Sequence, residues 1–253
     1  MFRRLVRNFS KLFLGKNFWK NYFKVYDTLN NLLSYKLLLN KVIFLADIKD
    51  NEKILDAGCG TGNLYFCLKK NNINYYGIDN IEEALKKARD KFKNSPKAFW
   101  SFMDLSKKLD FSGDFFDVII CNNVIYSLTE KGRDNALSEF YRVLKPKGRL
   151  VITFLKKKFS PKIIYFESFR LERRKRGKLK TYLLALNMLV PTLKIFFYNF
   201  LIKIKEQKNR FIFYKHAEIR NLLKKSDFEN IKIKNIYAGQ AYLVFCSKPG
   251  KAG

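Results

Sequence analysis

Short apolar runs alternate with longer amphipathic stretches between residues 53 and 154. The apolar runs have the length of buried strands, and the amphipathic stretches have the period of helices that cover a sheet. Strands are expected at 53–57, 75–79, 98–102, 117–121 and 149–154, and helices at 63–70, 81–92 and 129–144. Thr129 is expected to cap the last of these helices, and Lys145–Gly148 to form a turn. The alternation predicts a doubly wound α/β sheet with parallel strands.

The end of the chain returns to this globular pattern. A helix is expected over His216–Lys225, followed by strands at 230–237 and 241–247 that form an antiparallel pair. Together with the five earlier strands they give a Rossmann-like, seven-stranded sheet that is mostly parallel. The predicted core therefore comprises residues 51–155 and 210–253.

Residues 1–50 form a helical extension in this interpretation. Met1–Leu14 places apolar residues on one face and cations on another, which is typical of an amphipathic helix at a membrane surface. A second helix is expected from Phe18 to Leu45.

Residues 156–209 interrupt the alternation and are interpreted as a helical insertion. About eleven Lys and Arg stand against two acids from Lys156 to Lys180, and two apolar-aromatic stretches follow, hinged at Pro191. Their combined length approaches that of a membrane span, but Pro191 and Lys194 in the middle argue against a simple span. The insertion is expected either to lie in the surface of an anionic bilayer or to act as a soluble lid.

The charge of the chain points to an anionic partner. The 253 residues carry 51 Lys and Arg against 22 Asp and Glu, a net charge of +29, so nucleic acid and anionic bilayers are both candidates. A general bias of the source proteome toward lysine explains part of this excess. The four cysteines form no CxxC pair and the chain has one histidine, so no metal site is expected and the thiols indicate a reducing, cytoplasmic compartment. No secretory signal pattern is recognised.

A glycine-rich loop follows the first core strand and opens a helix. It reads Asp56-Ala-Gly-Cys-Gly-Thr-Gly62. Glycines at such a turn permit positive φ and let a ligand approach the backbone. A second acid, Asp79, ends the next strand, where a carboxylate can accept both hydroxyls of a ribose. The loop lacks the Gly-Lys-Ser/Thr of a phosphate-binding P-loop.

With these residues the chain resembles the class I S-adenosylmethionine-dependent methyltransferases. The loop is similar to the family's Asp/Glu-x-Gly-x-Gly-x-Gly motif, Phe102–Leu105 to its acid after the third strand, and Phe116–Tyr126 to its fourth-strand motif. The resemblance extends through residues 137–152 and, more weakly, through 211–248. It implies S-adenosylmethionine as cofactor. The cofactor-binding residues that it implies are Tyr26, Asp56, Ala57, Gly58, Cys59, Gly60, Gly62, Asp79, Asn80, Asp104, Leu105 and Asn122.

The acceptor is less clearly indicated. Cys121-Asn-Asn-Val124 lacks the prolines of base-directed amino methyltransferases, and the Pro-Cys setting of RNA cytosine-C5 enzymes is absent. Val25-Tyr26-Asp27 resembles an element that folds over the cofactor in quinone and phospholipid methyltransferases, and Tyr22 shares its helix face. Tyr26, Tyr126 and His216 are the candidate catalytic residues, although a structural role is the simpler interpretation of His216.

We therefore expect a methyltransferase that acts on a lipid, a phospholipid headgroup or an isoprenoid quinone, bound to the inner face of the cell membrane. An RNA methyltransferase is the alternative that the net charge favours. A cofactor-binding scaffold without turnover is the alternative outside catalysis. The acceptor atom, O, N or C, stays open.

Overall fold

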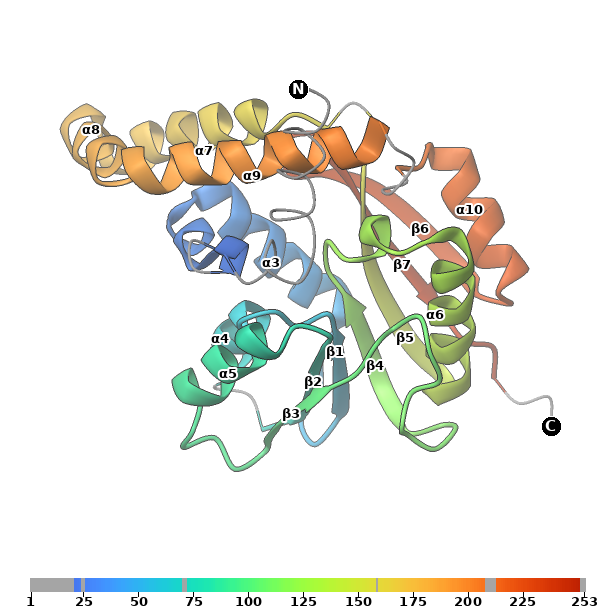
Figure 1. The fold of residues 1–253 in the computed structure, drawn as a ribbon. Helices are drawn as coiled ribbons and strands as arrows, with labels where there is room; N and C mark the ends of the chain where they lie inside the picture. Colours follow the sequence, from blue (N-terminus) through green and yellow to red (C-terminus); the bar gives the residue numbers. More distant parts are fainter. Residues whose placement is uncertain (1–20, 24–25, 70–71, 158, 208–212, 251–253) are drawn as a thin grey trace, which may run out of the picture.

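A computed structural model describes residues 21–250 except 24–25, 70–71, 158 and 208–212 (Figure 1). The amphipathic helix expected at Met1–Leu14 lies outside the described residues. The helix expected from Phe18 to Leu45 is wrong as a single element. A 3-10 helix at Asp27–Asn31 is followed by an α-helix, α3, at Leu33–Ala46, and Leu32 between them has an extended backbone.

The core is one seven-stranded sheet in the order β3-β2-β1-β4-β5-β7-β6. Its strands are β1 (Lys53–Ala57), β2 (Asn74–Asp79), β3 (Ala98–Phe102), β4 (Phe116–Cys121), β5 (Leu144–Leu155), β6 (Glu229–Ile236) and β7 (Ala241–Ser247). Strands β1 to β5 pair in parallel, and β7 pairs antiparallel with both β5 and β6. The predicted Rossmann-like sheet with an antiparallel C-terminal pair is confirmed.

Helices cover both faces of this sheet (Figure 1). On one face, Ile119 and Ile152 pack with α6 (Glu130–Val143) and α10 (His216–Lys225). On the other face, Ile120 and Val151 pack with α3 and α4 (Asn63–Leu68). Neighbouring residues of β4 and β5 thus serve opposite cores, which is why these strands are apolar without alternation. α5 (Glu82–Lys91) contacts β2 and β3.

Two local predictions have different outcomes. Thr129 caps α6 as expected, because its side chain accepts the Gly132 N–H at 3.1 Å. The turn expected at Lys145–Gly148 is wrong, since these residues lie inside β5. The pairing with β4 shifts register there, and Lys147 has φ +62°, so the extra residues form a bulge while the strand continues.

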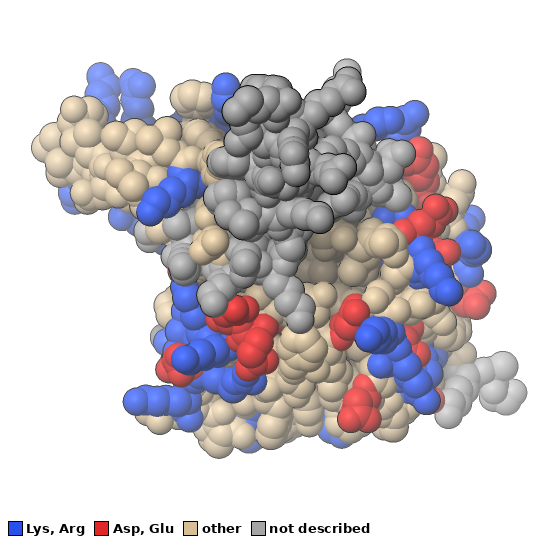
Figure 2. All heavy atoms as spheres, in the orientation of Figure 1, with Lys and Arg blue, Asp and Glu red and all other residues tan. Residues whose placement is uncertain are grey.

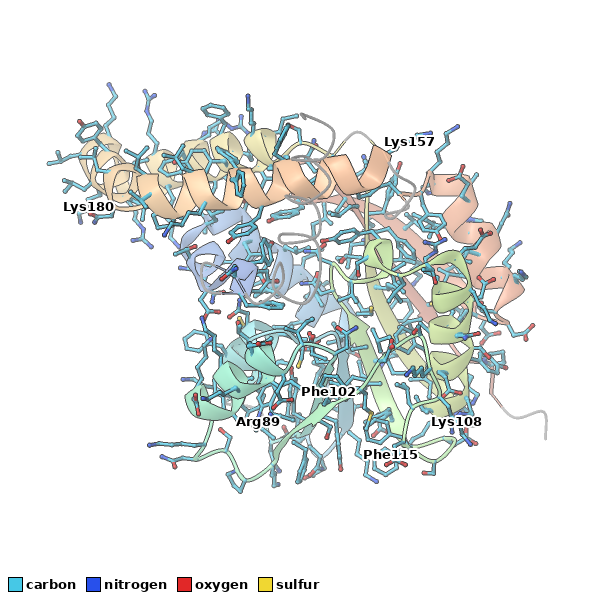
Figure 3. The ribbon with its side chains drawn as sticks, viewed as in Figure 1. Arg89, Phe102, Lys108, Phe115, Lys157 and Lys180 are labelled. Carbon is cyan, nitrogen blue, oxygen red and sulfur yellow. The ribbon has the colours of Figure 1, made fainter. Side chains whose placement is uncertain are left out.

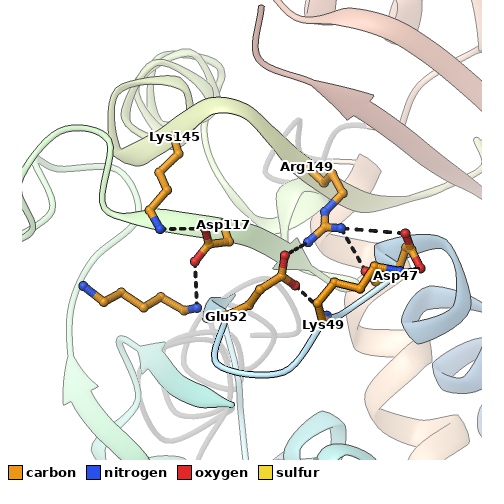
Figure 4. Close-up of polar contacts among 7 residues, drawn as sticks. Asp47, Lys49, Glu52, Asp117, Lys145 and Arg149 are labelled. Carbon is orange, nitrogen blue, oxygen red and sulfur yellow. Dashed lines mark hydrogen bonds and ion pairs between the residues drawn. The ribbon is translucent and has the colours of Figure 1, made fainter. Parts of the chain in front are cut away.

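Ion pairs gather at the amino ends of β1 and β4 (Figure 4). Arg149 pairs with Glu52 and donates to the Asp47 carbonyl at 2.8 Å. Asp117 accepts Lys145 Nζ at 2.6 Å and the Lys53 N–H at 2.9 Å. This edge of the sheet is thereby occupied by structural contacts, and the opposite, carboxyl edge carries the glycine loop.

Residues 161–207 form a helical arm of α7 (Pro161–Arg176), α8 (Lys178–Asn187) and α9 (Leu189–Gln207). α7 and α9 run side by side across one end of the molecule, with α8 at their far tip (Figure 1). The arm is anchored on α3, where Ser34 Oγ donates to the Ile164 carbonyl at 3.3 Å and the Ser34 N–H to Ser168 Oγ at 3.3 Å. α9 packs on α7 through Tyr165 and Phe196, whose ring centroids are 5.5 Å apart.

The chain bends by 60° between α8 and the first half of α9. The hinge lies at Met188 and not, as expected, at Pro191. Pro191 is the third residue of α9, where its missing N–H costs no helical hydrogen bond. Among the described helices, none is long and apolar enough to cross a bilayer alone, whereas residues 178–187 and 189–198 together have the necessary length and composition.

Candidate active site

The candidate site lies where the strand order reverses, between β1 and β4. The parallel strands β1 to β4 all end at this edge, and ligands of doubly wound sheets bind at such a switch point. Four of the segments singled out in the sequence meet here: the glycine loop after β1, Asp79 at the end of β2, Asp104 after β3 and Asn122 after β4.

The glycine loop is held open by left-handed backbone and by Asp79. Gly58, Gly60 and Gly62 have φ of +82°, +54° and +77°. The Gly60 N–H donates to Asp79 Oδ2 at 2.9 Å, and the Ile81 N–H donates to Asp79 Oδ1 at 3.0 Å. One carboxylate thus fixes both the loop and the turn after β2, and each of its oxygens retains lone pairs for a further donor.

Two buried carboxyls lie beneath the loop. Burial, together with the charge of Asp79, raises the pKa of Asp56 to about 7, although the hydrogen bond from the Tyr75 hydroxyl acts in the opposite direction. Burial raises the pKa of Asp79 to about 6, against its hydrogen bonds from backbone N–H groups. Near pH 7 Asp79 is therefore mainly a carboxylate, the form that accepts hydroxyl hydrogen bonds most strongly.

A segment before α3 is fastened to the loop from the other side. Lys91 Nζ bridges Asp27, at 2.8 Å, and the Thr61 carbonyl, at 3.0 Å, and the Thr61 hydroxyl donates to Asp27. Asn30 Nδ2 donates to Asn63 Oδ1 at 2.8 Å. Residues 27–31 therefore cover the loop and the start of α4, the placement that the Tyr26-Asp27 resemblance implies for an element folding over a cofactor.

The ends of β3 and β4 complete the edge. Asp104 Oδ1 accepts the N–H and hydroxyl of Ser106, at 2.9 and 2.7 Å, so the carboxylate shapes the turn after β3. The buried Thr153 hydroxyl lies 3.0 Å from Asn122 Oδ1, which ties the residue after β4 to β5. Of the other residues implied, Ala57, Cys59 and Leu105 are buried, and Asn80 is exposed.

Six tyrosines gather next to the loop. They are Tyr22, Tyr26, Tyr35, Tyr126, Tyr198 and Tyr237, which we call the tyrosine cluster. The Tyr22 ring lies 5.4 Å from the Tyr26 ring and 5.7 Å from the Tyr198 ring, between centroids. The hydroxyls of Tyr26 and Tyr35 are 3.2 Å apart. The cluster joins four segments that are distant in the sequence, around residues 22–35, 126, 198 and 237.

Burial determines the protonation of this cluster. It raises the pKa of Tyr126 to about 12, and it raises the pKa values of Tyr22, Tyr26, Tyr35 and Tyr237 above the usual range. These side chains stay neutral phenols at physiological pH. They offer flat apolar surfaces and hydroxyl donors, and they are not bases.

The structure brings two of the three candidate catalytic residues together. Tyr26 lies over Gly60, since a Cβ built on that glycine would be 3.8 Å from Tyr26 Cε1. Tyr126 follows β4 and stacks on Phe213 at 5.6 Å. His216 is apart from both, exposed at the first turn of α10 with its ring 6.0 Å from that of Tyr242.

Sequence reasoning missed several residues of the site. Tyr75 was treated only as strand, yet its hydroxyl is the partner of Asp56. Lys91 and Thr61 were not recognised as the contacts of Asp27. The alternation of side chains along β2 places Tyr75 on the same side as the buried Gly77, so the sequence does indicate that Tyr75 is buried. The contact between Lys91 and Asp27 joins distant segments and can be seen only in the folded structure.

Comparison with known proteins identifies a methyltransferase domain in part of the chain. The methyltransferase-domain family Methyltransf_25 matches residues 54–148, the span that contains the loop, Asp79, Asp104 and Asn122. Residues 54–148 are therefore a methyltransferase domain, in agreement with the resemblance that the glycine loop indicates. S-adenosylmethionine is the cofactor of this domain, and the glycine loop with an acceptor carboxylate at the end of β2 fits its adenosyl group.

A curated methyltransferase shares sequence with this domain. The ubiquinone/menaquinone biosynthesis C-methyltransferase UbiE of Methylococcus capsulatus is 33% identical over 137 residues, 50% of this chain and 54% of the relative. The chain thus spans about half the length of the curated relative that it matches.

Solved structures share the fold. A TehB-like SAM-dependent methyltransferase from Corynebacterium glutamicum superposes with a TM-score of 0.59 at 19% identity, over 92% of this chain and 98% of the other. Phosphoethanolamine N-methyltransferase 2 of Haemonchus contortus, in complex with S-adenosyl-L-methionine, gives a TM-score of 0.63 at 14% identity, over 95% of this chain and 60% of the other.

Proposed function

We propose that this protein methylates a lipophilic, ring-containing acceptor of the isoprenoid quinol class at the surface of an anionic membrane. The tyrosine cluster carries the proposal, because it places flat apolar surface and neutral hydroxyls directly beside the methyl-donor loop. The relationship to a quinone C-methyltransferase supports the same acceptor class.

The arm supplies a route for the acceptor. Exposed apolar side chains follow α9 at spacings of four, four and three residues: Leu189, Leu193, Phe197 and Phe200. This spacing keeps them on one helix face, which we call the apolar stripe. Tyr198, beside Phe197, contacts Tyr22 of the cluster. An isoprenoid chain that lies on the apolar stripe would therefore place its ring beside the tyrosine cluster.

The tyrosine cluster favours methylation of a carbon. When bound, S-adenosylmethionine supplies a methyl group activated by its positive sulfur. A ring carbon of a quinol, made nucleophilic by the ring hydroxyl groups, would accept this methyl group while the electron pair of the methyl–sulfur bond stays on the sulfur. The ring proton would be lost to solvent once the site opens for product release. Tyrosine hydroxyls orient the ring by hydrogen bonding and exclude water, and alignment supplies much of the rate. No strong base is required.

The membrane part of the proposal rests on charge and exposure together. Residues 156–209 hold 15 Lys and Arg against three Glu. In Figure 2 the end of the arm is mostly tan, with Lys and Arg at its margins. In Figure 3 Lys180 lies at this tip and Lys157 at the opposite end of the arm. Apolar side chains flanked by cations are typical of helices in the surface of an anionic bilayer.

The deciding experiment identifies the methylated molecule. Purified protein is incubated with methyl-labelled S-adenosylmethionine and host membranes, and the labelled product is analysed by mass spectrometry. We expect a C-methylated isoprenoid ring. A labelled nucleotide from added RNA would support the RNA methyltransferase alternative instead. Cofactor binding without any labelled product would support a non-catalytic scaffold. Asp79→Ala is the matched negative control, because it removes the acceptor of the Gly60 N–H.

A further inference from the structure

A hollow of about 490 Å³ opens between α7 and α8, away from the methyl-donor loop. Its lining consists of Phe169, Arg170, Arg173, Arg174 and Thr181. Three arginine side chains line the same hollow, which concentrates positive charge there although like charges repel one another. The methyl-transfer reaction uses none of these residues.

Nearby acids neutralise only part of this charge. Glu167 pairs with Arg170 at 2.7 Å, and Glu172 pairs with Arg176 at 2.9 Å. Within the described part of the chain, Arg173 and Arg174 form no ion pair, although the charge of Arg174 acts on Glu167 together with that of Arg170. Cations in the last turn of α7 interact favourably with the helix dipole, which is one reason for arginines there. That interaction does not explain why these arginines line a hollow.

The hollow adjoins apolar surface. Phe169 forms part of its wall, and Phe166, which is 68% exposed, lies one turn before Arg170 on the same face of α7. Guanidinium groups next to exposed apolar side chains match a molecule with an anionic head and an apolar tail. Arginine binds phosphate through two parallel N–H donors, which gives a fixed geometry.

We propose that this hollow binds the phosphate of an anionic phospholipid headgroup, with Arg173 and Arg174 as its principal donors. The inference rests on the membrane part of the proposed function and is independent of the acceptor. It orients the arm with the hollow and the exposed Phe166 of α7 toward the bilayer.

The test compares variants that lose equal charge from the same arm. Arg173→Gln/Arg174→Gln removes the donors of the hollow, and Lys178→Gln/Lys180→Gln removes the same charge outside it. Binding is measured by co-sedimentation with vesicles of phosphatidylglycerol and phosphatidylcholine and with vesicles of phosphatidylcholine alone. We expect the arginine variant to bind anionic vesicles on the order of tenfold more weakly, and the lysine variant only a few-fold more weakly. Equal losses would overturn the proposal in favour of diffuse attraction.

Two further measurements complete the test. One distinguishes the geometry of the guanidinium groups from their charge, and the other distinguishes binding of a lipid phosphate from binding of inorganic phosphate. Arg173→Lys/Arg174→Lys keeps the positive charge but loses the paired N–H donors of the guanidinium groups. This variant too must bind anionic vesicles more weakly than Lys178→Gln/Lys180→Gln. Inorganic phosphate at millimolar concentration must compete only weakly with the vesicles. Stabilisation of the wild type by inorganic phosphate, with vesicle binding unchanged in the arginine variant, would mark a soluble phosphate site and overturn the lipid assignment. Unchanged calorimetric binding of S-adenosylmethionine shows that each variant is folded, and product analysis tests the acceptor separately.

Discussion

Gly58 combines left-handed backbone with a neighbour that leaves no space for a side chain. Its φ is +82°, and a Cβ built on it would be 2.3 Å from Val124 Cγ2. The loop therefore packs directly on the segment after β4, which holds the methyl-donor and acceptor sides of the site together. Gly239 has a similar φ, +74°, but nothing within 4 Å of its Cβ position.

This pair of glycines gives the first prediction. Gly239→Ala should lower the free energy of unfolding by about 1 kcal/mol, the low end of the cost of left-handed backbone at a residue other than glycine. Gly58→Ala should lower it by about 1–3 kcal/mol more, since Val124 must also move, and should weaken cofactor binding. Chemical unfolding and calorimetry measure the two effects. Equal destabilisation of the two variants would contradict the close packing of the loop.

The second prediction concerns pH and Asp79. Because burial raises its pKa to about 6, Asp79 gains a proton as the pH falls from 7 to 5 and then accepts ribose hydroxyls poorly. Cofactor affinity should fall toward about tenfold per pH unit below that pKa. In Asp79→Asn the affinity should be lower at pH 7.5 and nearly independent of pH. A wild-type affinity that is constant from pH 5 to 7.5 would contradict the assignment.

The buried carboxyls also set the pH dependence of stability. Their pKa values are raised in the folded state above the ordinary value of 3.8. The folded state then holds protons that the unfolded state has lost, so this stabilisation is greatest below about pH 4 and is lost as the pH rises toward 7. Asp56→Asn, which keeps an acceptor for the Tyr75 hydroxyl, should show a smaller loss of unfolding free energy from pH 5 to 8 than the wild type. Urea unfolding at the two pH values measures this difference.

At the scale of elements, the segment at residues 27–31 acts through three contacts with the loop. Its ion pair between Asp27 and Lys91 is only partly shielded, with each side chain 33% exposed, so it contributes little to overall stability. Because the ion pair holds residues 27–31 over the glycine loop, we expect it to affect cofactor binding more than overall stability.

The next prediction follows from that difference. Asp27→Asn should weaken cofactor binding several-fold while changing the free energy of unfolding by less than about 1 kcal/mol. Asp114→Asn is the matched control, because it removes a comparable ion pair, with Lys248 at 2.7 Å, on the part of the fold that holds the structural contacts. Isothermal calorimetry distinguishes them. Similar cofactor affinities for both variants would show that the segment does not act on the site.

Elements were predictable from the sequence where their signals are local. The strands from Lys53 to Cys121 and the helix start at Thr129 depend on patterns that neighbouring residues create. Around Lys147 the sequence predicts a turn where the structure has a bulge, because proline and glycine are frequent in both. The break at Leu32 carries neither residue, so nothing in the local sequence marks it. Pro191 marked a break, but the first turn of a helix tolerates proline.

The candidate site was predictable only in part, for the same reason. The glycine loop and Asp79 lie on consecutive strands, so a sequence motif captures them. The tyrosine cluster draws Tyr22, Tyr126, Tyr198 and Tyr237 from segments up to about 200 residues apart, which no spacing rule connects. Their proximity is a property of the folded sheet and of the arm that crosses it.

At the scale of the whole molecule, positive charge is concentrated where apolar side chains are exposed. Residues 156–209 carry a net charge of +12 of the total +29. Attraction of these cations to an anionic surface is screened by salt, whereas burial of the apolar stripe is not.

Vesicle binding should therefore have two components. Raising the salt from about 0.1 to 0.5 M should remove most of the binding of a Leu189→Ser/Leu193→Ser variant and only part of that of the wild type. Both leucines are more than half exposed, so the fold should tolerate the substitutions. Flotation at two salt concentrations measures both components. Identical salt curves would show that the stripe does not enter the bilayer.

α9 places Phe197 and Tyr198 side by side in the chain, the first exposed and the second against Tyr22. A rigid helix cannot move one of them without the other. If the apolar stripe inserts into the bilayer, the same movement of α9 displaces Tyr198 in the wall of the proposed acceptor site. Contact with the membrane then changes the geometry of that site. Turnover of a short-chain, water-soluble quinol should then rise when empty anionic vesicles are added, although that substrate never enters them.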